Sequence, residues 1–410
     1  MLIRFSFKNF KSFKNENCLD MEATSLKEHE YNLIETDNGN FLKVAAIYGA
    51  NASGKTNVLQ AFEYMKTRIL VSNDAIKSYL ATDNENCYSF MINEQPIELE
   101  VEIVAKNNKI YKYGFEILKD KIISEWLYAK KKNTYSIIFE RQNKEINMPK
   151  NKEKFNVDES TLFLNLYSKL HSSDEDFASV YLWFMNTNYL DLGDPEFETF
   201  INDKVSGSIL NDENYRNELL KFIKAFDLGI EEIKTTPESI EQVKNGDGEI
   251  RVELIHRGED NRLRALPFEL ESNGTVKMFH LFDYFMEALK YGRVLLIDEL
   301  DTKLHPLLTR YIINLFHNSE TNIGNGQLIY STHDTVNLNK ETFRRDEIWF
   351  SEKNKDGVSK IYALSDYILD DDKHSGKKVR NDATYNKDYL TGRYGAIPIL
   401  EEFEIKLKRK

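Results

Sequence analysis

The chain has 410 residues, 41% of them apolar and 30% charged, which suits one large domain with an inserted lobe or two to three smaller domains. Its formal net charge of −12 repels nucleic acid on average, so DNA binding would need a local basic surface such as Lys130–Lys132 or the tail Lys406–Lys410. The sequence has no apolar run of membrane-spanning length, no signal-peptide pattern, and no metal-ligand spacing around Cys18 and Cys87, which predicts a cytoplasmic protein with reduced thiols and no membrane partner.

Strand patterns open the chain. Leu2–Phe10 alternates apolar and polar residues, which predicts a strand with Ile3, Phe5 and Phe7 on one face. Leu42–Tyr48 is a short apolar run that ends at a glycine, as expected of a buried strand that leads into a turn.

The middle of the chain changes its pattern twice. Short alternating segments from about residue 88 to residue 141 predict an antiparallel sheet. Residues 158–245 have mainly helical and polar patterns, which predicts an inserted helical lobe. Strand patterns return at Ile250–His256 and Arg264–Glu269.

The last third alternates short apolar strands with helical patterns, which is typical of a parallel sheet covered on both faces. We therefore predict the α/β fold class, with a mixed central sheet, an N-terminal antiparallel β subdomain and the inserted lobe. The predicted divisions are an N-terminal half at 1–157, the lobe at 158–245 and a C-terminal half at 246–410.

The sharpest motif is GANASGKT, Gly49–Thr56, which matches G-x-x-x-x-G-K-[ST] between a predicted strand and the helical pattern of Gly54–Leu70. Such a loop turns backbone N–H groups toward phosphate oxygens at a helix N-terminus. Lys55 would reach the β- and γ-phosphates of ATP, and the Thr56 hydroxyl would bind Mg²⁺. An incidental glycine-rich turn is the alternative. The predicted ATP-binding residues are Gly49, Asn51, Ala52, Ser53, Gly54, Lys55, Thr56 and Asn57.

An acidic pair follows the apolar strand in VLLIDELD, Val294–Asp301. Acids at this position lie at the carboxyl end of a strand, where open sheets bind ligands. Asp298 would hold Mg²⁺ through water, and Glu299 would act as the general base on the attacking water. Two solvated loop charges are the alternative.

Two further motifs complete the set. STHD, Ser331–Asp334, follows a short strand, and His333 could contact the γ-phosphate and orient the water; a surface histidine is the alternative. LESNGTVKMF, Leu270–Phe279, opens a helix with Ser272 and Gly274, which together could bind an anion. An ordinary helix N-cap is the alternative there.

These four motifs, in this order, resemble the ATP-binding-cassette ATPases, in particular the branch with RecF, the SMC proteins and the OLD nucleases. Asn9–Phe13 (NFKSF) is similar to the first strand-turn of that branch, which lies near the nucleotide base. Ser272–Thr275 stands where the family has its signature motif. The resemblance implies that Ser272 and Gly274 bind the γ-phosphate of ATP held by the opposite subunit, so that a homodimer or higher oligomer encloses ATP and Mg²⁺ and opens on hydrolysis.

The C-terminal part resembles stand-alone bacterial AAA-family ATPases of the RloA and abortive-infection type, at Arg344–Tyr367 and at Tyr389–Pro398 (YLTGRYGAIP). This resemblance implies antiviral defence beside a separate effector, a nuclease or a toxin. The alternatives are an ATPase that acts directly on DNA in repair or chromosome maintenance, and a scaffold that hydrolyses ATP very slowly.

The sequence also departs from these families. His305 replaces the aspartate that ends the loop after the acidic pair in SMC proteins, and Gln95 is only one candidate for the Mg²⁺-binding glutamine of the cassette. Too few residues follow His333 for the Toprim domain of OLD nucleases, and Asp370–Lys373 has the pattern of an acidic loop. We therefore predict no nuclease site in this chain.

Overall fold

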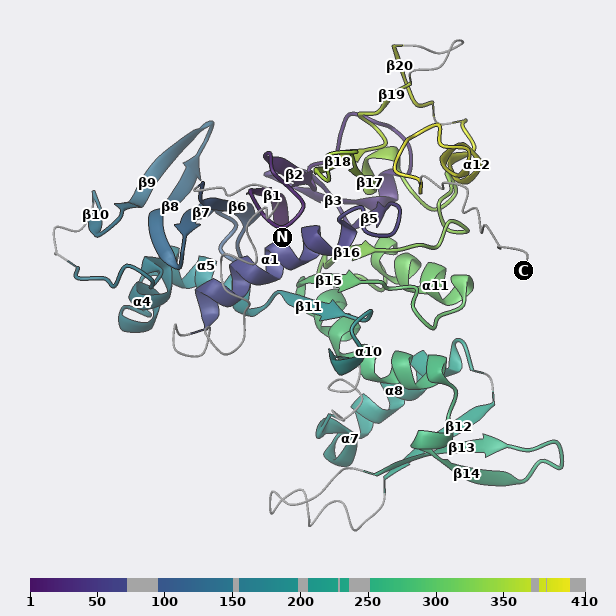
Figure 1. Cartoon of the computed structure of the whole chain (residues 1–410). Helices are drawn as coiled ribbons and strands as arrows, with labels where there is room; N and C mark the ends of the chain where they lie inside the picture. The colour runs from purple at the N-terminus through teal and green to yellow at the C-terminus, as the bar shows by residue number, and fades with distance from the viewer. Residues whose placement is uncertain are drawn as a thin grey trace, which may run out of the picture.

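The computed structural model describes residues 1–71, 95–149, 155–197, 206–227, 229–235, 251–369, 376–380 and 382–398. Its centre is a six-stranded sheet with the order β11-β15-β16-β5-β17-β18 (Figure 1). Strands β11 to β17 in this order run parallel, and β18 runs antiparallel to β17, which confirms the predicted mixed sheet. The bounds are Asn188–Asp191 (β11), Val294–Asp298 (β15), Gln327–Ser331 (β16), Val44–Tyr48 (β5), Ile348–Lys353 (β17) and Ser359–Ala363 (β18).

Both faces of this sheet are covered. Successive side chains of a strand point to opposite faces of the sheet, so alternate residues of β5 lie in two different cores. In β5, Ala45 and Ile47 lie in one core with α1 (Lys55–Leu70) and a second sheet. Val44, Ala46 and Tyr48 lie in the other core with α10 (Asn273–Tyr291) and α11 (Pro306–His317). This double burial explains why β5 is apolar throughout.

The second sheet is antiparallel and has seven strands in the order β10-β9-β8-β7-β6-β1-β2. It confirms the antiparallel sheet predicted from the alternating segments and adds the N-terminal strand to it. Helices α4 (Phe163–Leu170) and α5 (Glu175–Met185) pack against it with α1. The strand bounds are Leu2–Lys8 (β1), Asn17–Asp20 (β2), Ile97–Val104 (β6), Ile110–Leu118 (β7), Lys121–Lys131 (β8), Thr134–Gln142 (β9) and Glu145–Asn147 (β10).

The predicted common face of Ile3, Phe5 and Phe7 is wrong for its first residue. Phe5 and Phe7 lie in the core against α1, whereas Ile3 packs in a separate cluster with the hairpin of β3 (Leu33–Thr36) and β4 (Gly39–Leu42). The pairing of β1 with β6 shifts its register near the start of β1. A bulge at that place changes the face to which the next side chain points.

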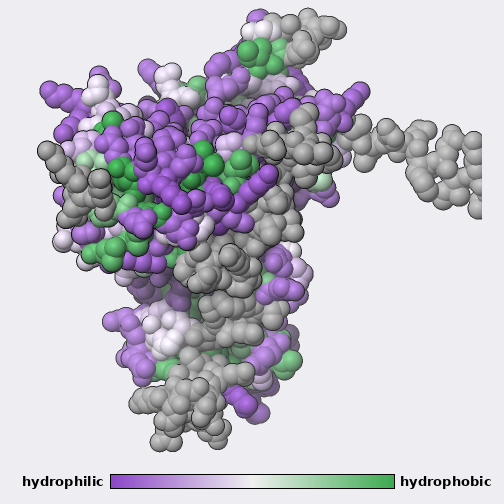
Figure 2. Space-filling model, turned by 60° about the vertical axis from the view of Figure 1, so that its left-hand side comes forward, coloured by the Kyte–Doolittle hydropathy of each residue, from purple (hydrophilic) through white to green (hydrophobic). Residues whose placement is uncertain are grey.

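The segment 158–245, predicted as one inserted helical lobe, does not form a single unit. Helices α4 and α5 pack on the seven-stranded sheet, and β11 joins the central sheet beside β15. A smaller lobe, drawn in the lower part of Figures 1 and 2, consists of the remaining helices and a three-stranded antiparallel sheet. Its elements are α7 (Ser208–Asn211), α8 (Glu213–Lys224), β12 (Ile230–Thr235), β13 (Val252–Arg257) and β14 (Leu263–Pro267). Helical periodicity shows that a helix has a buried face, but it does not show which core covers that face.

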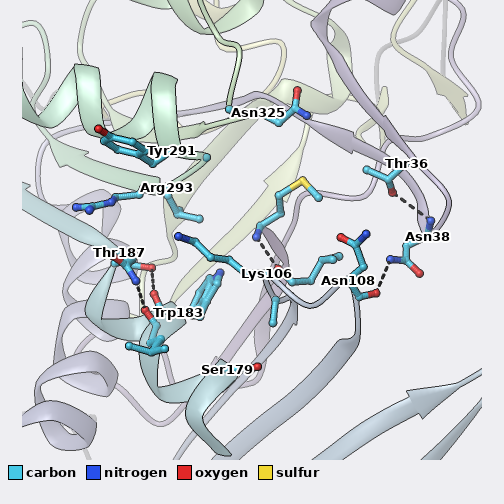
Figure 3. Close-up of a pocket in the computed structure, with 18 of the residues that line it drawn as sticks. Thr36, Asn38, Lys106, Asn108, Ser179, Trp183, Thr187, Tyr291, Arg293 and Asn325 are labelled. Carbon is cyan, nitrogen blue, oxygen red and sulfur yellow. Dashed lines mark hydrogen bonds between the residues drawn. The ribbon is translucent and has the colours of Figure 1, made fainter. Parts of the chain in front are cut away.

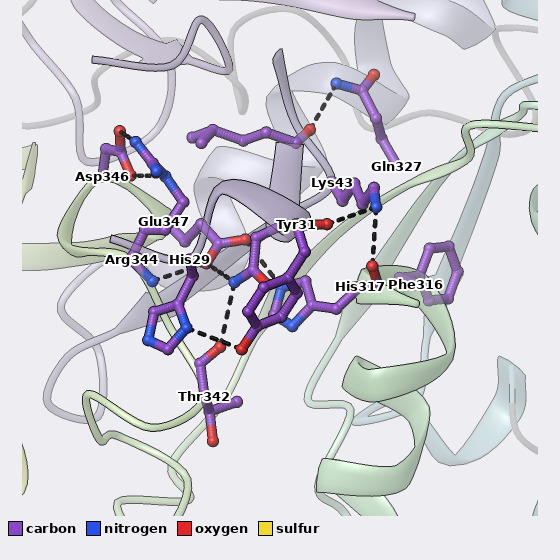
Figure 4. A network of polar contacts seen from close by, with 12 residues as sticks. His29, Tyr31, Lys43, Phe316, His317, Gln327, Thr342, Arg344, Asp346 and Glu347 are labelled. Atoms are coloured by element: carbon purple, nitrogen blue, oxygen red, sulfur yellow. Dashed lines mark hydrogen bonds and ion pairs between the residues drawn. The ribbon is translucent and has the colours of Figure 1, made fainter. Parts of the chain in front are cut away.

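Buried polar side chains connect the layers. Gln327 at the start of β16 accepts a hydrogen bond from the Leu2 amide (2.6 Å) and donates one to the Leu2 carbonyl (3.1 Å), which links the two large sheets. Lys43, directly before β5, donates to the carbonyls of Tyr31 (2.7 Å) and His317 (2.8 Å) (Figure 4). Removing either side chain would leave buried polar groups without partners, which is costly.

The C-terminal part of the described chain returns to the central sheet. Tyr389 of α12 (Tyr385–Leu390) stacks on Phe350 of β17, with ring centroids 5.3 Å apart. Short elements complete the fold: the 3-10 helices Glu30–Asn32, Phe268–Leu270 and Arg345–Glu347, and the strand pair β19 (Ile368–Leu369) and β20 (Lys377–Lys378). In the described ranges, no helix combines the length and apolar character of a bilayer-spanning segment.

Candidate nucleotide-binding site

Three of the four predicted motifs meet at one edge of the central sheet. Strands β15, β16 and β5 are neighbours and run parallel, so their carboxyl ends lie side by side. The loop Gly49–Thr56 (the phosphate loop) follows β5, the acidic pair lies at the end of β15, and His333 comes shortly after β16. This edge is where open α/β sheets bind their ligands.

Lys55 is the buried cation of the phosphate loop, with only 5% of the residue exposed. Its Nζ donates to the carbonyls of Gly49 (3.0 Å) and Ala50 (3.1 Å), so the side chain folds back over the loop. Burial lowers the pKa of Lys55, while the carboxylates of Asp298 and Glu299 act in the opposite direction. A phosphate oxygen would be a stronger acceptor than these neutral carbonyls, since charge-assisted hydrogen bonds are the stronger ones.

The phosphate loop is tightly packed at both of its glycines. A Cβ atom at Gly49 would lie 2.4 Å from the carbonyl oxygen of Ser351, and Gly54 has a φ of +114° that favours glycine. Between them, Asn51 and Ala52 are exposed at the tip, and the Ser53 carbonyl accepts hydrogen bonds from Ser351 (3.1 Å) and Ser359 (2.6 Å). Strands β17 and β18 therefore hold the loop in place.

Asp298 lies at the end of β15 with 2% of the residue exposed. The Ser331 hydroxyl donates to its carboxylate and accepts from the Glu299 amide (2.9 Å), and the Thr56 hydroxyl also donates to Asp298. Burial raises the pKa of Asp298, and the two hydroxyl groups oppose that shift. A cation beside this carboxylate would stabilise its charged form.

The residues around Asp298 fit Mg²⁺, which prefers hard oxygen ligands and is usually held by one or two carboxylates together with phosphates and water. Thr56 and Asp298 offer a hydroxyl and a carboxylate that already lie within hydrogen-bonding distance of each other. Across the described ranges there is no group of three or more acidic, histidine or cysteine side chains that could bind a metal without the nucleotide.

Glu299 is held from two sides. Its Oε2 accepts a hydrogen bond from the Thr302 hydroxyl (3.1 Å), and a Cβ atom at Gly193 would lie 2.9 Å from its carboxyl carbon. Its φ of +54° is uncommon for a residue other than glycine, and such conformations concentrate at functional sites. The loop after β11 thus fixes the position of this carboxylate.

His333 lies at the exposed rim of the same edge. Its backbone N–H donates to the carboxylate of Asp301 at 3.3 Å. Partial burial and the charge of Lys55 lower the pKa of the imidazole, against the opposing effect of Asp301. The ring is therefore neutral at pH 7 and can both donate and accept a hydrogen bond.

Ser272 and Gly274 are not joined to this edge by the described contacts. Ser272 is exposed and caps α10, because its Oγ accepts a hydrogen bond from the Thr275 amide (3.1 Å). The Thr275 hydroxyl in turn donates to Asp227 (3.1 Å). The ordinary N-cap is therefore present, with Ser272 exposed.

The remaining sequence candidates have local roles in the structure. Asn57 donates to the Ser12 hydroxyl (2.8 Å), which ties α1 to the turn Asn9–Phe13. The Gln95 carbonyl accepts from Asn9 (2.7 Å) next to that turn, and His305 caps α11 by accepting from the Leu307 amide (3.2 Å). Cys87, Asp370–Lys373 and Lys406–Lys410 lie outside the described residues.

Comparison with known families decides the class of this site. Residues 44–339 match the family described as "AAA domain, putative AbiEii toxin, Type IV TA system". The chain belongs to this family. It is a P-loop ATPase of the AAA type, and the matched segment contains all four motifs.

The similar solved structures are distant. They include an SMC head bound to the C-winged helix domain of ScpA, at 15% identity and a TM-score of 0.49, covering 88% of this chain and 97% of that chain. Another is the recombination mediator RecF with ATP, at 13% identity and a TM-score of 0.37, with coverage of 88% and 97%. No curated protein matches the chain.

Two parts of this AAA-family site were missed in the sequence. Asp191 ends β11 directly opposite Asp298, so a second short strand that ends in an acid lies at the same edge. The signal was present in NYLDLGD, but the surrounding helical patterns obscured it. Beyond the family match, the Ala396 carbonyl accepts from the Ala50 amide (2.9 Å), so the segment Tyr389–Pro398 contacts the phosphate loop.

Proposed function

We propose that this AAA-family chain binds ATP and Mg²⁺ between two copies of itself and hydrolyses the γ-phosphate. The observation that supports this most directly is the joint position of Lys55, Thr56 and Asp298. A buried cation, a hydroxyl and a buried carboxylate meet at the N-terminus of α1, directly after the phosphate loop. This set fits a phosphate chain with its metal.

In the proposed reaction, Lys55 leaves the loop carbonyls and binds the β- and γ-phosphates. Thr56 and Asp298 would hold Mg²⁺, which neutralises the phosphate charge when bound. Glu299, kept in place by Thr302 and the Gly193 loop, accepts the proton of the attacking water. The neutral His333 accepts or donates a hydrogen bond at the γ-phosphate and orients that water.

The second half of the site is proposed to come from a partner copy. Ser272 is exposed at a helix N-terminus, where free N–H groups and the hydroxyl suit an anion. Its described partners belong to its own helix rather than to the phosphate loop of the same chain. A second copy would therefore place Ser272 and Gly274 on the γ-phosphate, and ATP would join the two subunits.

The Glu299→Gln variant tests this proposal. The amide keeps the shape of the side chain but cannot take the proton, so we expect turnover to fall about 100-fold or more. ATP should then be retained, and light scattering should show an ATP-dependent dimer that the wild type forms only transiently. Equal phosphate release by the variant and the wild type would show that Glu299 is not the base.

We further propose that the ATPase regulates a separate nuclease or toxin in anti-phage defence of the abortive-infection type. The family description, which names a type IV toxin–antitoxin system, supports a role in such a system, and the resemblance of Tyr389–Pro398 to ATPases of the abortive-infection type supports the separate effector. The test is phage plating on cells that express the chain with its genomic neighbours, compared with cells that express the Lys55→Ala variant. Equal plating on both would contradict the defence role, and tight ATP-dependent binding of duplex DNA by the isolated chain would favour action on DNA instead.

A further inference from the structure

A cavity of about 930 Å³ opens at the other end of the central sheet. It is bounded by Val294 at the start of β15, Gly292 at the C-cap of α10, the end of α5 and the β3–β4 turn. Because β15 has five residues, about 17 Å of strand separates this cavity from Asp298. Its volume is at the upper end of the range for small-molecule pockets.

Basic and aromatic side chains share one side of the cavity. Figure 3 shows Lys106, Arg293 and Trp183 on this side, with the Tyr291 ring beside Arg293. The Arg293 guanidinium lies 5.8 Å from the centroid of that ring. Such a wall offers flat surfaces on which a planar ring can stack and cations that can bind an anionic group.

Both cations retain unused binding capacity. Within the described part of the chain, the exposed Lys106 has no hydrogen-bond or ion-pair partner. Arg293 pairs with Glu287 through Nη1, but its buried Nε has no hydrogen-bond partner. Arg293 also lines the cavity, where its guanidinium can bind a ligand oxygen.

The opposite side of the cavity is acidic and rich in amides. Glu35 and Asp37 line it from the β3–β4 hairpin and its turn, and Asn38 donates to the Asn108 carbonyl (3.1 Å), which holds the turn against the β6–β7 loop (Figure 3). These two carboxylates disfavour a ligand with several negative charges, such as a triphosphate. They would accept hydrogen bonds from hydroxyl or amino groups.

We propose that this cavity binds a nucleoside monophosphate. The phosphate would lie against Lys106 and Arg293, the base would stack on Trp183 or Tyr291, and the ribose hydroxyls would face Glu35 and Asp37. A ligand of this class has one anionic group for the cations, a planar ring for the aromatic side chains, and hydroxyl groups that donate hydrogen bonds to the carboxylates. The site is separate from the phosphate loop and does not depend on ATP turnover.

The experiment is a calorimetric titration of the full chain with AMP, GMP, CMP and UMP. We expect at least one of them to bind, and the Lys106→Glu variant to weaken that binding about tenfold or more, because it reverses a charge beside the phosphate. The control is Lys132→Glu, which makes the same charge change on an exposed turn outside the cavity and should leave the affinity unchanged. Lys55→Ala should also keep the binding, since it alters only the ATP site.

Three outcomes would overturn the proposal: no binding of any of the four nucleotides, equal weakening by Lys106→Glu and Lys132→Glu, or loss of binding in Lys55→Ala with retention in Lys106→Glu. Because Lys106 is exposed and makes no described polar contact, its variant should unfold at the wild-type temperature. If Lys106→Glu unfolds earlier, Lys106→Ala serves the same comparison.

Discussion

At the scale of single residues, Gly193 offers a sharp test of how Glu299 is positioned. A Cβ atom there would lie 2.9 Å from both the carboxyl carbon and Oε2 of Glu299, so Gly193→Ala must displace this carboxylate. We expect turnover to fall about 10- to 100-fold, because small displacements of a catalytic group are that costly. The affinity for ATP should stay unchanged, since Lys55 and Thr56 are untouched. Steady-state kinetics and equilibrium ATP binding measure the two effects.

A matched control exists at Gly207, where an added Cβ atom meets nothing within 4 Å. Gly207→Ala should therefore hydrolyse ATP at the wild-type rate. Equal rates for Gly193→Ala and the wild type would show that Glu299 tolerates displacement and is not the positioned base.

His333 predicts a pH dependence. Burial and Lys55 lower its pKa below the ordinary 6.5, so it is neutral at pH 7 to 8 and becomes charged only as the pH falls through the lowered value. Protonation removes the acceptor nitrogen, and turnover should fall on that acidic side. The unfolded chain binds this proton more readily, so the free energy of unfolding also falls with decreasing pH. The pH–rate profile of His333→Gln should lack this acidic step; the same step in both proteins would assign it to another group.

The sequence predicted where most of these residues lie, but not what holds Glu299 in position. Lys55, Thr56, Asp298 and His333 could be placed because each lies at a fixed offset from a short apolar strand. The positioning of Glu299 could not be predicted, because Gly193 is more than a hundred residues away in the chain and contacts it only through the fold. Within its own chain, Ser272 acts as an ordinary N-cap, so its role across a dimer stays a prediction.

At the scale of elements, Lys43 is the side chain that connects the start of β5 to α11 and to the segment before β3. Its Nζ has three oxygen partners, including the Ser319 hydroxyl at 2.9 Å. Lys43→Ala would leave buried carbonyls without donors, and we expect the free energy of unfolding to fall by about 2–4 kcal/mol. Urea unfolding measures this loss. The exposed Lys340→Ala is the control, and an equal effect of both variants would contradict the structural role of Lys43.

The sequence predicted those strands whose hydrophobic pattern alone identifies them. Strands β15 and β16 were recognised as parallel and β5 as a buried strand, because each is mainly apolar on both faces, and the alternating segments predicted the antiparallel sheet. Strand β11 was missed, because four residues between helical patterns are too short for periodicity to separate them. The assignment of α4 and α5 to the seven-stranded sheet depends on tertiary contacts with Phe139.

At the scale of the whole molecule, the account depends on two copies sharing each ATP. The phosphate loop and Asp298 lie at the edge of the central sheet, while Ser272 starts the helix from which the smaller lobe extends (Figure 1). Composition gave only the size and the acidic balance of the chain. An oligomer cannot be derived from composition, because its interface combines residues distant in the sequence.

Mixing two inactive variants tests this claim most directly. Lys55→Ala removes the phosphate-binding cation, and Ser272→Arg blocks the site that we assign to the partner. If the site is shared, a mixed dimer has one ATP site with both residues intact. Equal mixing should then restore about a quarter of the wild-type rate, since half of randomly formed dimers are mixed. Each variant alone should be inactive. Full activity of Ser272→Arg alone, or no recovery in a mixture shown to contain mixed dimers, would contradict the shared site.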